Sequence, residues 1–260
     1  MLKFLVVGAH PDDPDADAGG LALKMRSKGH AVYFLSLTNG NAGHHTMAKE
    51  PLRARRLCEM QDVAKVYDIQ YDTLDIDDGY LTADIPTREK LMRYIRTVRP
   101  DVIIAPRTND YHPDHRAVGQ LVCDCSYLVG VPLFCPDVPA MHNHPVILSC
   151  EDRFTYPAPF RPDIAVAIDE FAEQKVHGLL QHKSQYYEWL AYDADWTPVL
   201  EAKSEEEATA WLTARELDRF AGPVKRFPGM FDKGVRYGEV YQIDEYGGEM
   251  TEEIRSAMVD

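Results

Sequence analysis

Five short apolar runs, each with the length and composition of a buried strand, alternate with helical patterns along this chain. The runs cover residues 4–7, 31–37, 101–105, 145–148 and 164–168. Apolar residues spaced three and four apart predict helices over residues 19–28, 57–67, 87–98, 118–129 and 171–190. Strands that alternate with helices are joined by right-handed crossovers, which makes the sheet mostly parallel. The pattern therefore predicts an α/β fold with a Rossmann-like, mostly parallel sheet and helices on both faces.

The segment from Tyr192 to Asp232 differs in character from the part before it. It contains Trp196, Trp211, an acidic run at 205–207 and stretches rich in glycine and proline. An acidic run of this kind is typical of the solvated first turn of a helix. We expect residues 1–190 to form the α/β domain, and residues 191–260 to form a C-terminal cap or extension that packs on the same domain.

Acidic residues outnumber basic ones, with 42 Asp and Glu against 28 Lys and Arg in 260 residues and a net charge of −14. Nucleic acids and anionic membranes bind basic patches, so neither is an expected partner. Five cysteines without a Cys-x-x-Cys pair argue against a disulfide framework and a thiolate metal site. No run reaches the length of a membrane span, and no secretory signal pattern precedes the first strand. We expect a cytoplasmic protein that forms a homo-oligomer.

Two short strings of histidine and aspartate follow two of the predicted strands. His10-Pro11-Asp12-Asp13 comes after the run at 4–7, and His112-Pro113-Asp114-His115 comes after the run at 101–105. In an open α/β sheet, ligands bind at the carboxyl ends of the strands. Either string alone is more typical of a turn or a helix N-cap. Because both strings follow buried strands, we expect them to meet at one edge and form a split metal site.

Zinc enzymes that hydrolyse their substrates use three protein ligands and leave a fourth position to water. We take His10, Asp13 and His115 as these ligands, for one zinc or another divalent ion per chain. Asp12 and His112 then lie beside the metal without binding it. A free carboxylate suits a general base, and a free imidazole suits an electrostatic or acid partner.

These residues resemble a known family, the PIG-L/LmbE-like zinc-dependent N-acetylglucosaminyl deacetylases. The resemblance rests on both histidine strings, together with weaker motifs, which are Gly19-Gly20, Arg56-Leu57-Cys58-Glu59, His182-Lys183-Ser184-Gln185 and Tyr237-Gly238-Glu239. The family usually has an acidic residue soon after the second aspartate, whereas here Pro14 comes before Asp15. The resemblance implies a hydrolase that removes the N-acetyl group from an N-acetylglucosamine-like amino sugar or glycoside.

In the reaction that the resemblance implies, Asp12 takes a proton from water and passes it to the leaving nitrogen. His112, if it is cationic, stabilises the oxyanion, and Asp114 is placed to orient or charge His112. The family also implies a substrate contact for Arg56 and a contact with sugar hydroxyls for Asp78. A surface salt bridge to Glu59 and an Asp-Gly turn are the respective structural alternatives.

Two other functions remain open at this point. One is a thiol-conjugate amidase of the same fold, and the other is a non-catalytic protein that binds a sugar or a metal. Asp12 and His112 argue against the second function, because a binding module needs neither a base nor an acid. The residues expected near the site include no cluster of cations, so a highly anionic substrate such as a polyphosphate is not expected. The histidines of the 39–45 loop are interpreted as a loop or pocket wall, and His182 is given no role.

Overall fold

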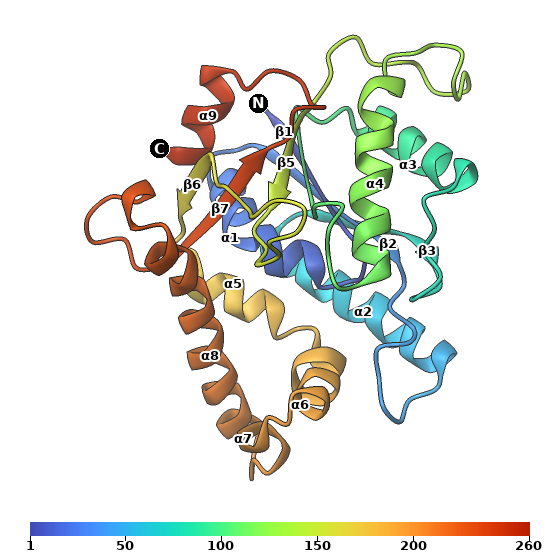
Figure 1. Cartoon of the computed structure of the whole chain (residues 1–260). Helices are drawn as coiled ribbons and strands as arrows, with labels where there is room; N and C mark the ends of the chain where they lie inside the picture. Colours follow the sequence, from blue (N-terminus) through green and yellow to red (C-terminus); the bar gives the residue numbers. More distant parts are fainter.

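The computed structural model describes residues 1–260 and contains one sheet of seven strands in the order β3-β2-β1-β4-β5-β7-β6 (Figure 1). The strands β1 to β5 are parallel, and β7 pairs antiparallel with both β5 and β6. Their bounds are β1 Lys3–Gly8, β2 Ala31–Thr38, β3 Gln70–Ile76, β4 Val102–Ala105, β5 Val146–Cys150, β6 Ile164–Ala167 and β7 Gly238–Ile243. The predicted fold class is confirmed.

Helices cover both faces of the sheet. They are α1 Asp13–Ser27, α2 Lys49–Tyr67, α3 Ile85–Val98, α4 Pro113–Leu128, α5 Ala172–Leu179, α6 Leu190–Asp193, α7 Thr197–Leu200, α8 Glu205–Arg226 and α9 Glu252–Val259, with a π-helix, η1, at Ser184–Trp189 and a 3₁₀ turn, η2, at Pro228–Met230. In β1, Phe4 and Val6 pack with α1, α2, α5, α8 and α9, whereas Leu5 and Val7 pack with α3 and α4. Alternate residues of a strand point to opposite faces, so each buried strand contributes to two cores.

Two predicted helices differ from the observed ones. α1 begins at Asp13 rather than Gly19, because Pro14 fits the first turn of a helix, and α1 is kinked at Ala18. The helix predicted over residues 171–190 is interrupted between α5 and the π-helix η1. At this break the Ser184 N–H and hydroxyl both donate to the Glu59 carboxylate, at 2.8 and 2.6 Å. Bonds to α2 therefore replace the continuation of a regular helix.

Two strands lack the long apolar runs on which the strand predictions relied. β3 lies at the edge of the sheet, and most of its side chains are partly exposed. β7 comes from the last part of the chain and lies inside the sheet, between β5 and β6. The residues after 190 therefore complete the sheet as well as cover it, since α8 packs against β7. The acidic run at 205–207 forms the first turn of α8 after the N-cap Ser204, as predicted.

None of the helices combines the length and the apolar character that a membrane crossing requires.

Candidate metal centre and active site

The two histidine strings meet at the carboxyl edge of the sheet. β1 leads into the first string, and its neighbour β4 leads into the second. Each string also starts a helix, because Asp12 is the N-cap residue of α1 and His112 is the N-cap residue of α4. Pro14 and Pro113 lie in the first turns, where a missing N–H costs no hydrogen bond. The positive ends of two helix dipoles therefore meet at one site.

His10, Asp13 and His115 form a compact set of three donors. The Asp13 Oδ2 atom lies 3.2 Å from His10 Nδ1 and 3.3 Å from His115 Nε2, and the three donor atoms lie within 4.8 Å of one another. Two atoms that bind one tetrahedral zinc ion lie roughly 3.3–3.5 Å apart, given bonds of about 2.0–2.2 Å. The residue types and their spacing therefore fit a divalent metal ion such as zinc.

The hydrogen bonds around these donors fix their orientation. The N–H groups of Ala9 and His10 both donate to Asp13 Oδ2, at 2.9 and 2.7 Å. His115 Nδ1 lies 3.1 Å from the carboxylate of Asp110, so Nε2 is left for a metal. A carboxylate on the second ring nitrogen is the usual support of a metal-binding histidine. Sequence reasoning missed Asp110, whose only signal was its place in the loop before His112.

The other ring nitrogen of His10 faces two further carboxylates. His10 Nε2 lies 3.2 Å from Asp78 Oδ1 and 3.5 Å from Asp114 Oδ2, and it has no other partner although it is buried. A proton on Nε2 leaves Nδ1 as the lone-pair donor toward Asp13 and His115. His10, His112 and Asp114 form a second possible donor group. In that group, however, His10 would turn its lone pair away from Asp13 and His115.

The charge of the Asp13 carboxylate requires a compensating positive charge. Burial raises the pKa of Asp13, but the charges of His115 and His10 outweigh burial and hold it well below its ordinary value. Burial lowers the pKa of His115, but Asp13 and Asp110 raise it to about 10. The Asp13 carboxylate is thus ionised and compensated by positive charge, which imidazolium or a metal ion supplies.

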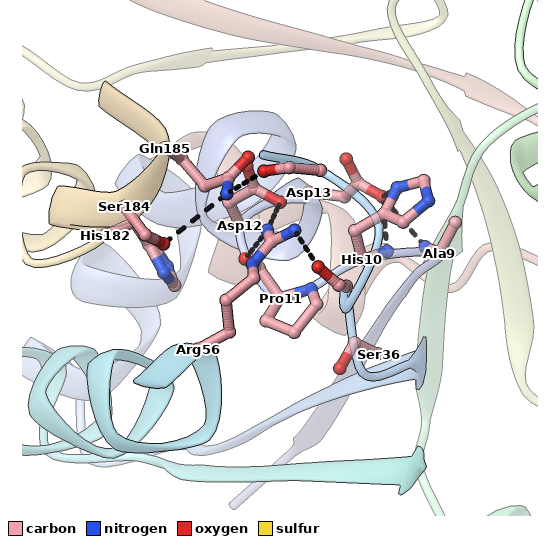
Figure 2. A network of polar contacts seen from close by, with 12 residues as sticks. Ala9, His10, Pro11, Asp12, Asp13, Ser36, Arg56, His182, Ser184 and Gln185 are labelled. Carbon is pink, nitrogen blue, oxygen red and sulfur yellow. Dashed lines mark hydrogen bonds and ion pairs between the residues drawn. The ribbon is translucent and has the colours of Figure 1, made fainter. Parts of the chain in front are cut away.

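Asp12 is held apart from the three donors in an unusual backbone conformation, with φ at +150°. Its N–H donates to the Tyr71 hydroxyl at 3.1 Å, and its carboxylate accepts from Arg56 at 2.8 Å (Figure 2). Burial raises the pKa of Asp12, against the charge of Arg56 and together with that of Asp13. The structure therefore presents a carboxylate beside the donor set, with a pKa above its ordinary value.

Arg56 does not form the predicted surface salt bridge with Glu59. It is 2% exposed, and its guanidinium also donates to the carbonyls of Pro11, at 2.6 Å, and Gly40, at 3.3 Å. The salt bridge to Glu59 belongs to the preceding residue, Arg55, at 3.0 Å. Arg56 instead connects the segment His10-Pro11-Asp12-Asp13 to the 39–45 loop. Figure 2 shows its bonds to Pro11 and Asp12.

The contact between Asp114 and His112 differs from the prediction. The Asp114 carboxylate accepts the Gly79 N–H at 2.7 Å, and it is the Asp114 backbone N–H that donates to His112 Nδ1, at 3.2 Å. Burial and the charges of His10 and His115 lower the pKa of His112, which disfavours the cationic form. Because Nδ1 accepts a hydrogen bond, the proton of the neutral ring is on Nε2.

Comparison with known proteins finds one family match. Residues 5–126, just under half of the chain, match the family model of PIG-L, the GlcNAc-PI de-N-acetylase. Over 240 residues the chain is 27% identical to diacetylchitobiose deacetylase of Thermococcus kodakarensis, which covers 89% of this chain and 85% of the relative.

Two solved structures share the fold of the whole chain. N,N'-diacetylchitobiose deacetylase from Pyrococcus horikoshii has a TM-score of 0.74 and 22% identity, covering 94% of this chain and 84% of that one. GalB, the 4-carboxy-2-hydroxymuconate hydratase from Pseudomonas putida, has a TM-score of 0.73 and 20% identity, covering 97% and 99%. Similarity to both continues beyond residue 126 into the C-terminal part of the chain.

Asp78 lies in the Asp-Gly turn that was its structural alternative, and its contact with sugar hydroxyls stays a prediction. In this turn Gly79 has φ at +81°, and Asp78 is buried. Its carboxylate faces His10 and accepts the Ala42 N–H at 3.3 Å. Asp78 therefore ties the turn to the histidine and to the 39–45 loop.

Residues beyond the family match reach the site from the break after α5. His182 is completely buried, and its Nε2 lies 3.4 Å from Asp15 Oδ2, which also accepts the Tyr71 hydroxyl at 2.9 Å. Burial lowers the pKa of His182, but the charge of Asp15 raises it overall. Asp15 thus supports Tyr71 and His182 rather than Asp13. Only the weak His-Lys-Ser-Gln motif could have indicated this network.

The 39–45 loop packs against η1 and α6. His44 Nε2 lies 2.8 Å from Glu188 of η1, and His45 stacks on Tyr192 with ring centroids 4.0 Å apart. Trp196 packs against Trp211 within the C-terminal helices. Tyr111 is 74% exposed beside His115.

A cleft of about 290 Å³ opens from the donor set toward the ends of β4 and β5. Asp13 and His115 form its floor, and its walls include Arg107, Asp152 and Arg153 from the loops after these strands. Two arginines therefore lie near the site, and Arg107 is paired with Asp152.

Proposed function

We propose that this chain is a zinc-dependent hydrolase that removes the N-acetyl group from an N-acetylglucosamine-like amino sugar or glycoside. The observation that carries the proposal is the set of His10, Asp13 and His115 with the non-ligand carboxylate of Asp12 beside it. Deacetylases of amino sugars among the relatives support the same reaction.

His10, through Nδ1, and His115, through Nε2, would hold the ion together with Asp13. A bound zinc ion supplies Lewis acidity, which polarises a carbonyl group and lowers the pKa of water from about 15.7 to about 7. The acetamido group would enter the cleft whose floor is formed by Asp13 and His115. Among the larger cavities, this cleft is the one next to these donors.

Asp12 would accept a proton from the attacking water while the new carbon–oxygen bond forms. It would then give this proton to the sugar nitrogen, so that the carbon–nitrogen bond breaks and the products are acetate and a free amine. Arg56 holds the Asp12 carboxylate in place through a hydrogen bond, and the Tyr71 hydroxyl accepts the Asp12 backbone N–H.

His112 would act as a neutral hydrogen-bond donor. Its Nδ1 is occupied by the Asp114 N–H, so its Nε2–H is available for the oxygen on which negative charge develops. A preorganised donor of this kind contributes ~3–4 kcal/mol to transition-state stabilisation. A neutral ring replaces the cationic His112 of the sequence-based hypothesis.

A panel assay tests the proposed function. The purified, zinc-loaded chain is incubated with N-acetylglucosamine, its small glycosides and N-acyl thiol conjugates, and the products are identified by mass spectrometry. We expect a loss of one acetyl group from the amino sugars. Release of a larger acyl group from the thiol conjugates alone would favour the amidase instead.

Hydration of a carbon–carbon double bond is a second candidate. The hydratase GalB matches this chain over 97% of its length with a TM-score of 0.73. This match is about as good as that of the Pyrococcus horikoshii deacetylase, with a TM-score of 0.74. A hydratase would use the same base to activate water but would release no acetate. Addition of one water to an unsaturated polycarboxylate, with no deacetylation in the panel, would select this function.

We further propose that the bound ion is zinc, with one ion per chain, and that the protein is a cytoplasmic homo-oligomer. All five cysteines are free, the state favoured in a reducing compartment. Leu133 and Phe134 are exposed on one loop and offer an apolar contact between copies. Elemental analysis and light scattering of the purified protein test the ion and the assembly.

A further inference from the structure

A groove lined by positively charged side chains runs along one face of α8. We call it the arginine groove, and its lining consists of Arg153, Arg215, Asp218, Arg219, Gly222, Lys225 and Arg226. The α8 members recur at intervals of three and four, so they share a single helix face. Figure 1 shows α8 extending beyond the sheet, away from α3 and α4. Five cations thus gather on a chain whose net charge is −14.

The arginine groove is continuous with the cleft at the candidate metal centre. Arg153 lines the groove and also the cleft that contains Asp13 and His115. Between them lies a hollow of about 200 Å³, lined by Arg153, Arg219 and Arg226 together with Asp17. A molecule with one end at Asp13 and His115 could therefore extend along the sheet edge to the arginines.

The arginines of the groove keep unused donors. Arg153 is exposed and makes no hydrogen bond or ion pair. Arg219 binds Glu216 through Nε at 2.7 Å, which leaves both of its terminal nitrogens free. Arg226 binds Glu151 through one terminal nitrogen at 2.5 Å. A guanidinium has five N–H donors in a planar fork, which suits the oxygens of a carboxylate or phosphate.

Acidic neighbours offset only part of this charge, because the five cations of the groove have only three acidic partners, Glu216, Asp218 and Glu151. Asp152 is engaged by Arg107 through two bonds of 2.5 and 2.6 Å, and Glu239 is engaged by Lys175 at 2.7 Å. Glu216 is shared between Arg215 and Arg219, and Asp218 binds Lys225 at 2.8 Å. Glu151 and Asp17 also line the hollow. Glu151 pairs with Arg226, and burial together with the charge of Asp13 raises the pKa of Asp17 to about 7.

We propose that the arginine groove binds an anionic group, a phosphate or a carboxylate, carried by the substrate whose acetamido group lies at the metal centre. This inference rests on the proposed function and narrows the substrate to an anionic amino sugar or glycoside. Arg153 contacts the substrate between the two ends, and Arg219 and Arg226 bind the anion.

Steady-state kinetics test the inference with N-acetylglucosamine, its 6-phosphate and its 1-phosphate, and N-acetylmuramic acid as a carboxylate. We expect at least one anionic compound to have a higher kcat/KM than the neutral sugar. Arg153→Gln and Arg219→Gln should each reduce the ratio of anionic to neutral kcat/KM by about 10- to 100-fold, because each removes a charge-assisted contact. Arg153 makes no internal contact, so its variant keeps the fold. Lys203→Gln, a charge removal on the exposed residue before α8, should leave the ratio unchanged.

Equal kcat/KM for neutral and anionic sugars, with no effect of either arginine variant on the ratio, overturns the inference and leaves the deacetylase function intact. If no sugar is deacetylated, the proposed function fails, and calorimetry with glucosamine 6-phosphate still tests the groove: binding weakened by both arginine variants supports it. Inorganic phosphate that binds the wild type and not Arg219→Gln, without any preference for anionic substrates, shows a free-anion site and overturns the substrate assignment.

Discussion

At the scale of single residues, Asp12 and Asp13 are adjacent in sequence but differ in every contact. Asp13 accepts two backbone N–H groups and faces both histidines, whereas Asp12 faces Arg56 and is held through Tyr71. The backbone between them turns through the unusual φ of Asp12, which costs of order 1–3 kcal/mol and persists only because these bonds hold it. This local strain allows neighbouring carboxylates to take two different roles.

The two roles predict different losses on substitution. Asp12→Asn should retain the metal and lose kcat by about 100- to 10,000-fold, because it removes a proton acceptor. Asp13→Ala and His115→Ala should each lose most of the metal. Elemental analysis and steady-state kinetics on the same preparations measure both effects. A metal-free Asp12→Asn together with an active Asp13→Asn would reverse the assignments.

Tyr71 predicts a positioning effect on Asp12. Tyr71→Phe keeps the buried ring but leaves the Asp12 N–H without its acceptor, which should cost about 1–3 kcal/mol of stability. We expect kcat to fall about tenfold while KM and metal content stay unchanged. Tyr94→Phe is the matched control, because it removes a hydroxyl that binds Asp72 away from the site. A Tyr71→Phe variant that is destabilised but has normal kcat would limit Tyr71 to a structural role.

The convergence of the proposed metal donors was within reach of sequence reasoning, because each donor follows a recognisable strand. The roles of Arg56, Asp114 and His182 were not, since they depend on which loops face one another after folding. Positions 55 and 56 hold the same residue type. Arg55 nevertheless pairs with Glu59 and Glu188, whereas Arg56 is buried against Asp12. Spacing predicts which residues share an edge, but it does not predict which hydrogen bond each one makes.

At the scale of elements, α1 and α5 pack closely around the ring of Tyr67 from α2. Tyr67 is 1% exposed, and its hydroxyl donates to the Lys175 carbonyl at 3.0 Å. Gly178 of α5 lies against this ring, where a Cβ atom would overlap its carbons. This contact determines how closely α5 approaches the site. It also sets the position of His182, which lies in the break after α5.

Gly178→Ala should therefore destabilise the protein by about 1–3 kcal/mol, because overpacking forces the ring or the helix to shift. Thermal or urea unfolding measures the loss. Gly229→Ala serves as the control, since nothing lies within 4 Å of its added Cβ, and its stability should match the wild type. Equal stability of the two variants would mean that α5 moves away from Tyr67 without cost.

At the scale of the whole molecule, the alternation of strands and helices predicted the parallel part of the sheet and both covered faces. The antiparallel edge was not predicted, because β7 lacks a long apolar run and its partners β5 and β6 come much earlier in sequence. The arginine groove was missed for a related reason: Arg153 and the α8 cations converge only after β7, on which α8 packs, has paired with β5. Long-range pairing of this kind leaves no local periodicity in the sequence.

The position of β7 also predicts the result of truncation. A chain that ends at residue 190 lacks the strand between β5 and β6, and it exposes the edge of β5. We expect this fragment to aggregate or to show no cooperative unfolding transition, although it contains every proposed metal donor. Circular dichroism and size-exclusion chromatography measure this. A stable, monomeric fragment would support a boundary at residue 190 between two independent parts.

The carboxylate of Glu239 in β7 accepts the N–H groups of Gly20 and Leu21, each at 2.8 Å, across more than two hundred residues of chain. During synthesis on the ribosome, these two amides of α1 therefore cannot bond to their acceptor until nearly the entire polypeptide has been made. Contacts of such long sequence separation form slowly, and intermediates without them expose sheet edges to other chains. The late arrival of a single strand thus makes the yield of native protein sensitive to elongation rate and to chaperones that shield the unfinished sheet.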